Sequence, residues 1–141
     1  MRAVWIKSDL ITAVGFKSVH MPKRDKMRCR VVVTGMGVVS PIGIGIETFQ
    51  EALFEGRNGI SEITLFDASS YRSQIAGEVT DFDPGSCLSL KQIGRMDRFT
   101  QMGMAAAKEA IEQAGISQNE EDSSEIGILV GSGVGGLYTI G

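Results

Sequence analysis

Two short runs of apolar and β-branched residues most constrain what this chain can fold into. Residues 30–34 (RVVVT) end at Gly35, and residues 126–130 (IGILV) end at Gly131. Continuous apolar runs of this length, bounded by glycine, are typical of strands that a parallel sheet buries on both faces. We therefore expect both runs to be strands of one parallel sheet.

Two segments between these runs carry a helical period. Apolar residues recur at three- and four-residue spacing from Ile46 to Leu53 and stop at Gly56, which predicts a short amphipathic helix. A longer helix is predicted over residues 95–114, with Gly115 as its C-cap. The middle of its apolar stripe is mostly alanine and glycine, so this helix can lie unusually close to a sheet.

The order strand, helix, helix, strand predicts the α/β class, with parallel strands joined by a right-handed crossover. Residues 36–43 contain two glycines and a proline, and they are expected to form a structured loop after the first strand. Residues 60–78 are expected to be irregular, with one short strand within residues 74–79.

The charge is distributed unevenly along the chain. Residues 1–30 hold eight Lys or Arg and two acidic residues, which gives +6, whereas residues 31–141 hold six and fifteen, which gives −9. The acidic body is therefore a poor candidate for binding nucleic acid. No apolar run reaches the roughly 18 residues that a membrane-spanning helix needs, so no membrane span is expected.

Residues 1–27 form a basic leader that we separate from the domain at 28–141. Three interpretations of the leader stay open: a disordered extension, an organelle-targeting peptide, or upstream sequence translated from a mis-called start, since Met27 precedes a basic lead into the first strand. Under each of them the leader is dispensable for folding. The expected localisation is cytoplasmic if the protein is bacterial, and plastid or mitochondrion if the leader is a targeting peptide.

The chain offers few residues for nucleophilic or metal chemistry. Its two cysteines, Cys29 and Cys87, form no CxxC, and the only histidine is His20 in the leader. A catalytic thiolate needs a neighbouring base or a helix N-terminus, and neither cysteine has one in the predicted elements. Both are interpreted as incidental thiols, and no metal and no cofactor are expected.

Residues 131–136 (GSGVGG) match the spacing GxGxxG directly after a strand. In dinucleotide-binding proteins these glycines let a pyrophosphate approach the backbone, but a following helix and an acidic residue about 20 positions on are needed to confirm such a site. Those features would fall beyond Gly141. A glycine-rich turn leaving a buried strand is the simpler interpretation, and Ser132 has Val130 and Val134 at the two positions where a GxSxG nucleophile motif needs glycines.

Taken in order, several segments resemble the beta-ketoacyl-acyl carrier protein synthases, the condensing enzymes of fatty-acid synthesis. The opening at residues 30–43 (RVVVTGMGVVSPIG) carries most of the resemblance. The other matching segments, in the same order as in the family, are 49–53, 56–61 (GRNGIS), 66–67, 75–77 (IAG), 95–99 (RMDRF) and 128–136 (ILVGSGVGG). The likeness therefore covers about residues 28–141.

The resemblance implies a thiolase-like fold of two similar α/β halves, of which residues 28–141 would be the N-terminal part. It implies decarboxylative condensation of acyl and malonyl thioesters carried by acyl carrier protein, usually by a homodimer. The family's active cysteine and two histidines lie further along than Gly141, so no catalytic residue is assigned here and the fragment alone is expected to be inactive. By similarity, Gly133 and Val134 match the stretch that borders the acyl-chain pocket.

Two alternatives remain beside an acyltransferase fragment. One is a nucleotide-binding module of Rossmann type, based on residues 131–136. The other is a non-catalytic partner subunit that keeps the condensing fold. Sequence downstream of Gly141 would separate the three, because it would carry a cysteine nucleophile, an acidic ribose-binding residue, or a replaced nucleophile.

Overall fold

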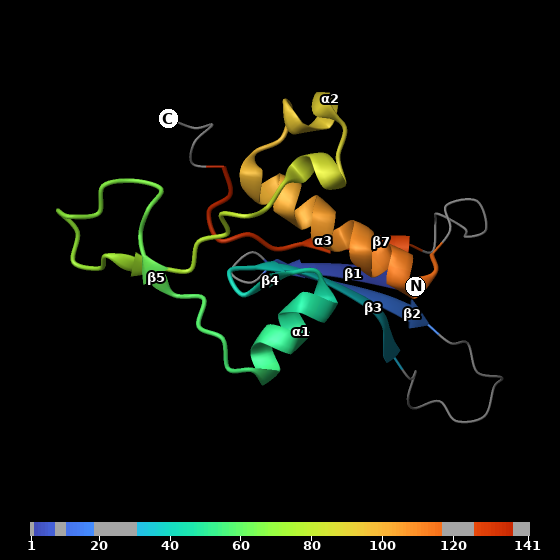
Figure 1. The fold of residues 1–141 in the computed structure, drawn as a ribbon. Helices are drawn as coiled ribbons and strands as arrows, with labels where there is room; N and C mark the ends of the chain where they lie inside the picture. The colour runs from blue at the N-terminus through green and yellow to red at the C-terminus, as the bar shows by residue number, and fades with distance from the viewer. Residues whose placement is uncertain (1, 8–10, 19–30, 117–125, 137–141) are drawn as a thin grey trace.

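The computed structural model describes residues 2–7, 11–18, 31–116 and 126–136. Its larger sheet has five strands in the order β4-β3-β2-β1-β7 (Figure 1). The strands are β1 (Arg2–Lys7), β2 (Ile11–Ser18), β3 (Val31–Ser40), β4 (Gly43–Ile44) and β7 (Ile126–Val130). Helix α3 (Arg98–Ala114) lies along one face of this sheet, and α1 (Ile46–Phe54) lies on the other side of it (Figure 1). The chain is therefore an α/β protein, as its sequence predicts.

The sheet is mixed, which corrects the expectation of a parallel sheet. Strand β1 pairs in parallel with β7, whereas β1–β2, β2–β3 and β3–β4 are antiparallel pairs. Two antiparallel steps separate β3 from β1, so β3 and β7 run in the same direction. They are not neighbours, because the hairpin of β1 and β2 lies between them.

The leader differs from the expectation of a disordered extension, since two of its segments are strands in the middle of the sheet. The register joins Ala13 to Gly37 of β3 on one side, and Val4 to Ile128 of β7 on the other. The physical reason is that strand pairing satisfies backbone N–H and C=O groups, which every residue but proline carries, whatever the charge of the segment. Where translation starts, and whether the leader targets an organelle, stay predictions.

Strand β3 continues to Ser40 through residues that the sequence predicts to be a loop. Its two glycines lie within the strand and not at its end. Because they have no side chain, they allow α3 to lie directly on the strand. A Cβ on Gly35 would overlap the carbonyl oxygen of Ala110, and a Cβ on Gly37 would overlap that of Ala106. The close approach expected from the small residues of the helix is thus confirmed.

Helix α3 begins three residues later than predicted and ends where predicted, at the left-handed C-cap Gly115 (φ 63°). Its buried residues include Ala106, Ala107 and Ala110, which form a core cluster with Val39 and Phe82.

The two apolar runs are not buried along their whole length, which corrects a second expectation. Val33 is 51% exposed and Ile128 is 74% exposed. Helix α3 ends opposite Gly35, so the first residues of β3 extend past its cover.

The remaining elements are short. Helix α1 lies where its period predicts, and residues 60–78 are largely irregular apart from the paired strands β5 (Ser61–Glu62) and β6 (Ile75–Ala76). A 3₁₀ turn, η1 (Pro84–Ser86), precedes α2 (Leu90–Ile93), which has a capping box between Ser89 and Gln92. Among the described residues, none of the helices combines the length and hydropathy that crossing a membrane requires.

Candidate functional site

Three segments that are distant in the sequence meet at Pro41, in the turn after β3. A Cβ on Gly59 would lie 2.9 Å from Pro41 Cβ and 2.7 Å from Ile42 Cγ2, and a Cβ on Gly77 would lie 2.9 Å from Pro41 Cγ. Only glycine fits at such a separation, so Gly59 and Gly77 let both segments close on the proline. Segments 40–43, 56–61 and 75–77, all part of the family resemblance, are therefore neighbours in space.

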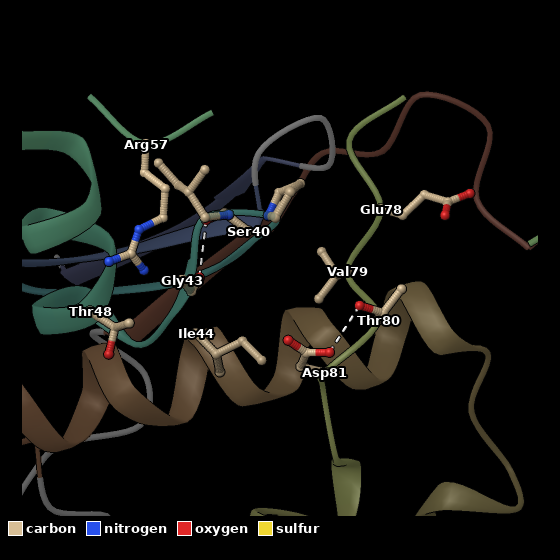
Figure 2. Close-up of a pocket in the computed structure, with 11 residues that line it drawn as sticks. Ser40, Gly43, Ile44, Thr48, Arg57, Glu78, Val79, Thr80 and Asp81 are labelled. Atoms are coloured by element: carbon tan, nitrogen blue, oxygen red, sulfur yellow. Dashed lines mark hydrogen bonds between the residues drawn. The ribbon is translucent and has the colours of Figure 1, made fainter. Parts of the chain in front are cut away.

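A cavity of about 450 Å³ opens beside this junction (Figure 2). Its lining comes from the turn after β3, the start of α1, the residue Arg57 beyond α1, and the segment that leads toward η1. The lining residues are Ser40, Pro41, Ile42, Gly43, Ile44, Thr48, Arg57, Glu78, Val79, Thr80 and Asp81. Cysteine and histidine are absent from this lining. The cavity therefore has the size of a ligand site without a thiol or an imidazole for covalent chemistry.

The hydroxyl of Ser40 shapes one wall. The side chain is almost fully buried, and its Oγ donates to the carbonyl oxygen of Gly43 at 3.0 Å and accepts from the backbone N–H of Ile42 at 3.3 Å. Figure 2 shows the first of these bonds across the turn. A hydroxyl held by two backbone groups is a turn residue, so Ser40 fixes the shape of the wall.

The opposite wall, Val79 to Asp81, is held in place from α3. Arg98 donates from one guanidinium nitrogen to the carbonyl oxygens of Val79 (3.0 Å) and Phe82 (3.3 Å). Its guanidinium also lies 5.5 Å from the centroid of the Phe82 ring, within the range of a cation–π contact. Sequence reasoning missed this role, although Arg98 belongs to the RMDRF segment of the resemblance.

The charged groups of the cavity are engaged with partners. Arg57 forms an exposed ion pair with Glu55 at 2.7 Å. The side-chain hydrogen bond from Thr64 lowers the pKa of Glu78, and backbone N–H groups of Thr64 and Leu65 contribute in the same direction. Because a lowered pKa keeps the carboxylate ionised, Glu78 is poorly suited to acting as a general acid.

The two residues predicted to bind substrate lie elsewhere, after β7. Val134 is 69% exposed, and neither it nor Gly133 lines the cavity at Pro41. The next residue, Gly135, has φ 75°, and a Cβ there would lie 3.7 Å from the ring of Phe99 at the start of α3. The assignment of Gly133 and Val134 to an acyl-chain pocket stays a prediction.

Of the two cysteines and the histidine considered for nucleophilic chemistry, Cys87 lies within the described residues, whereas Cys29 and His20 lie outside them. Cys87 packs beside the core cluster, and its Sγ is 3.6 Å from the carbonyl oxygen of Pro84. Among the described residues, no three His, Cys, Asp or Glu side chains gather in a way that could hold a metal ion.

Comparison with known proteins identifies the class to which this fold and these segments belong. Residues 28–140 match the family described as beta-ketoacyl synthase, N-terminal domain, so the chain belongs to the beta-ketoacyl synthase family. One solved structure, described as the ishigamide ketosynthase/chain length factor, superposes with a TM-score of 0.52 at 38% identity, and covers 61% of this chain and 21% of that one. The likeness implies a thiolase-like fold.

The similar curated proteins carry a more specific name than the family does. The chain is 47% identical over 108 residues to the 3-oxoacyl-[acyl-carrier-protein] synthase 2 of Coxiella burnetii, covering 77% of this chain and 26% of that protein. It is also 47% identical over 111 residues to the protein of the same name from Synechocystis, covering 79% of this chain and 27% of that protein. The chain thus spans about a quarter of the length of these relatives.

Proposed function

We propose that this chain is the amino-terminal part of a 3-oxoacyl-[acyl-carrier-protein] synthase of fatty-acid biosynthesis. The match of residues 28–140 to the beta-ketoacyl synthase N-terminal domain carries the proposal, and the names of the relatives at 47% identity support it. The complete enzyme would condense an acyl thioester with malonyl-acyl carrier protein and release carbon dioxide.

The finer features of the proposal follow from the same family. The complete protein would be a thiolase-like homodimer of two similar α/β halves. Its partner would be acyl carrier protein, and its acyl-chain pocket would be bordered by Gly133 and Val134. It would be cytoplasmic in a bacterium, and would be found in a plastid or mitochondrion if the leader is a targeting peptide.

One observation favours a second candidate, a non-catalytic subunit with the condensing fold. The solved structure that superposes on this chain is described as a chain length factor together with a ketosynthase. The nucleotide-binding alternative has no such support, because the glycine-rich segment 131–136 falls inside the match to the beta-ketoacyl synthase family.

The test reads the gene past codon 141 and uses any coding sequence that is found to continue there. Protein expressed with that continuation should become acylated on a cysteine when it is incubated with labelled acyl-carrier protein, and should then release a β-ketoacyl product. Protein of only 141 residues should not become acylated on Cys29 or Cys87, since the sequence offers only His20 as an imidazole base. A continuation with the nucleophile replaced would favour the non-catalytic subunit. Stoichiometric acylation of the 141-residue chain with product release would refute the assignment of chemistry to the region beyond Gly141.

A further inference from the structure

Helix α1 has no cap from its own segment. Its N-cap residue is Gly45, with φ 87° and ψ 151°, and no side chain there bonds the first turn. Positive φ of this kind is readily reached by glycine alone, so the backbone turn at residue 45 rules out the Ser, Thr, Asp or Asn that usually caps a helix. The first N–H groups of α1 therefore need an acceptor from another element.

Glu109 of α3 provides that acceptor. Its Oε1 accepts the N–H of Ile46, the first residue of α1, at 2.6 Å. A Cβ on Gly45 would lie 3.3 Å from the same oxygen. The carboxylate of Glu109 thus fills the space that a capping side chain at residue 45 would use, and it adds a negative charge where the helix dipole favours one.

The second oxygen of the same carboxylate reaches the sheet. Oε2 of Glu109 accepts the N–H of Val38 in β3 at 3.0 Å. Val38 and Ile46 bracket the turn at residues 39–45, which is closed at its base by a backbone bond from Gly45 N–H to Val38 O at 2.9 Å. One carboxylate therefore binds both ends of the turn whose residues 40–44 line the cavity at Pro41.

A second side chain of α3 also binds a backbone amide of β3. Gln113, one helical turn later, accepts the N–H of Met36 through Oε1 at 2.6 Å. Strand β4 pairs only with Val39 and Ser40 of β3. Side chains from α3 thus bond the amides of Met36 and Val38, where β3 has no partner strand on that side among the described residues.

We propose that Glu109 is a positioning residue that caps α1 from α3 and holds the turn at residues 39–45 closed. The cavity wall at residues 40–44 then takes its shape only when α3 is docked on β3. This inference concerns the turn and the helix, and it does not depend on the proposed enzymatic function.

Hydrogen exchange at single amides of the 141-residue chain tests the proposal, in variants Glu109→Gln and Glu109→Ala. Glutamine keeps one acceptor oxygen and turns an NH₂ donor toward the other amide. Hydrogen bonds to charged groups contribute more than neutral ones, so exchange at Val38 or Ile46 should rise roughly tenfold in Glu109→Gln. Both amides should exchange faster in Glu109→Ala, while amides in the middle of α3 keep their rates.

Two further variants separate this role from general loosening of α3. Glu112→Gln changes an exposed carboxylate whose ion pair with Lys108 is a long contact of 3.9 Å, and it should leave exchange at Val38 and Ile46 unchanged. Gln113→Ala should speed exchange at Met36 and leave Ile46 unchanged. Unchanged rates at Val38 and Ile46 in Glu109→Gln, or an even rise across all amides, would overturn the proposal. If Glu109→Ala unfolds, the glutamine variant decides alone.

Discussion

Gly37 is the residue at which the contact between β3 and α3 is tightest. A Cβ there would overlap the carbonyl oxygen of Ala106, and it would also lie 2.9 Å from the carbonyl carbon of that residue. Backbone atoms inside a helix cannot shift separately, so Gly37→Ala should lower the free energy of unfolding by about 1–3 kcal/mol, the usual cost of overpacking. Urea unfolding followed by circular dichroism measures this change.

Gly94→Ala is the matched control for that substitution. A Cβ on Gly94 would meet its nearest neighbour, the carbonyl oxygen of Leu90, at 3.6 Å, and its backbone is right-handed helical. The control should be close to neutral. A loss at Gly94 equal to that at Gly37 would show that the contact with α3 does not set the cost, because replacing glycine with alanine restricts the unfolded chain and by itself favours folding at both sites.

Glu78 offers a prediction on pH. Hydrogen bonds from Thr64 hold its pKa below the ordinary 4.5, so its contribution to stability is present above pH 4.5 and is lost as the pH falls through the lower folded value. Thr64→Val removes the hydroxyl donor, which is the largest cause, and should raise the pKa of Glu78 toward its ordinary value. NMR titration of the Glu78 carboxyl carbon checks this. An unchanged pKa in Thr64→Val would assign the shift to the backbone donors.

Val134 carries the prediction on substrate choice, which applies to a complete enzyme. If Val134 borders the acyl pocket, Val134→Phe takes up chain volume and should disfavour long acyl primers over short ones by about 1–3 kcal/mol in kcat/KM. Leu90→Phe adds a ring at a side chain that is 87% exposed, and it should not discriminate between primers. Equal kinetic losses for short and long primers with Val134→Phe would reject the assignment.

At the scale of elements, Arg98 joins the start of α3 to the segment that forms one wall of the cavity. Arg98→Met keeps much of the side-chain length, and it leaves the carbonyl oxygens of Val79 and Phe82 without their donor. The expected loss of stability is about 0.5–1.5 kcal/mol, the usual net contribution of a hydrogen bond, because water can reach the acceptors, and proteolysis between residues 78 and 82 should become faster. Arg95→Met changes an exposed arginine nearby and should have little effect on either measurement.

The elements that the sequence predicts well are those with a local cause. Helix α3 follows from its periodic apolar stripe, and its end follows from Gly115, whose φ of 63° needs glycine. The closeness of α3 to β3 follows from small residues on both. Each of these features can be predicted because it depends on residues that are near each other in the sequence, or on small side chains that both elements carry.

The elements that the sequence does not predict depend on distant partners. Pro41 meets Gly59 and Gly77, and no local pattern pairs these three residues. The cap of α1 comes from Glu109, which is 63 residues away from Ile46. Charge and side-chain patterning do not predict the strands of the leader, because the pairing of these strands rests on backbone groups.

At the scale of the whole molecule, the leader is the feature on which sequence and structure differ most. Residues 1–26 contribute the two strands that separate β3 from β7. A chain that starts at Met27 would leave backbone groups along β3 and β7 without these partners, so it should melt several degrees below the full chain. Differential scanning calorimetry of the two chains decides between this outcome and the dispensable leader that the sequence favours.

A point substitution in the full chain complements the deletion. Ala13→Pro removes one backbone donor within β2 and should lower the melting temperature in the same direction, since Ala13 pairs with Gly37 of β3. Identical melting of the full chain, the Met27 chain and Ala13→Pro would show that the leader does not stabilise the body.

The bonds from Gln113 and Glu109 to Met36 and Val38 span 77 and 71 residues, which has a consequence for synthesis on the ribosome. Strand β3 leaves the exit tunnel long before the helix that covers it has been translated. At about 5–20 residues per second, its apolar residues and open amides wait several seconds for that cover. During this interval the nascent strand can pair with other chains, and chaperone binding to residues 31–40 should be strongest before Gln113 emerges.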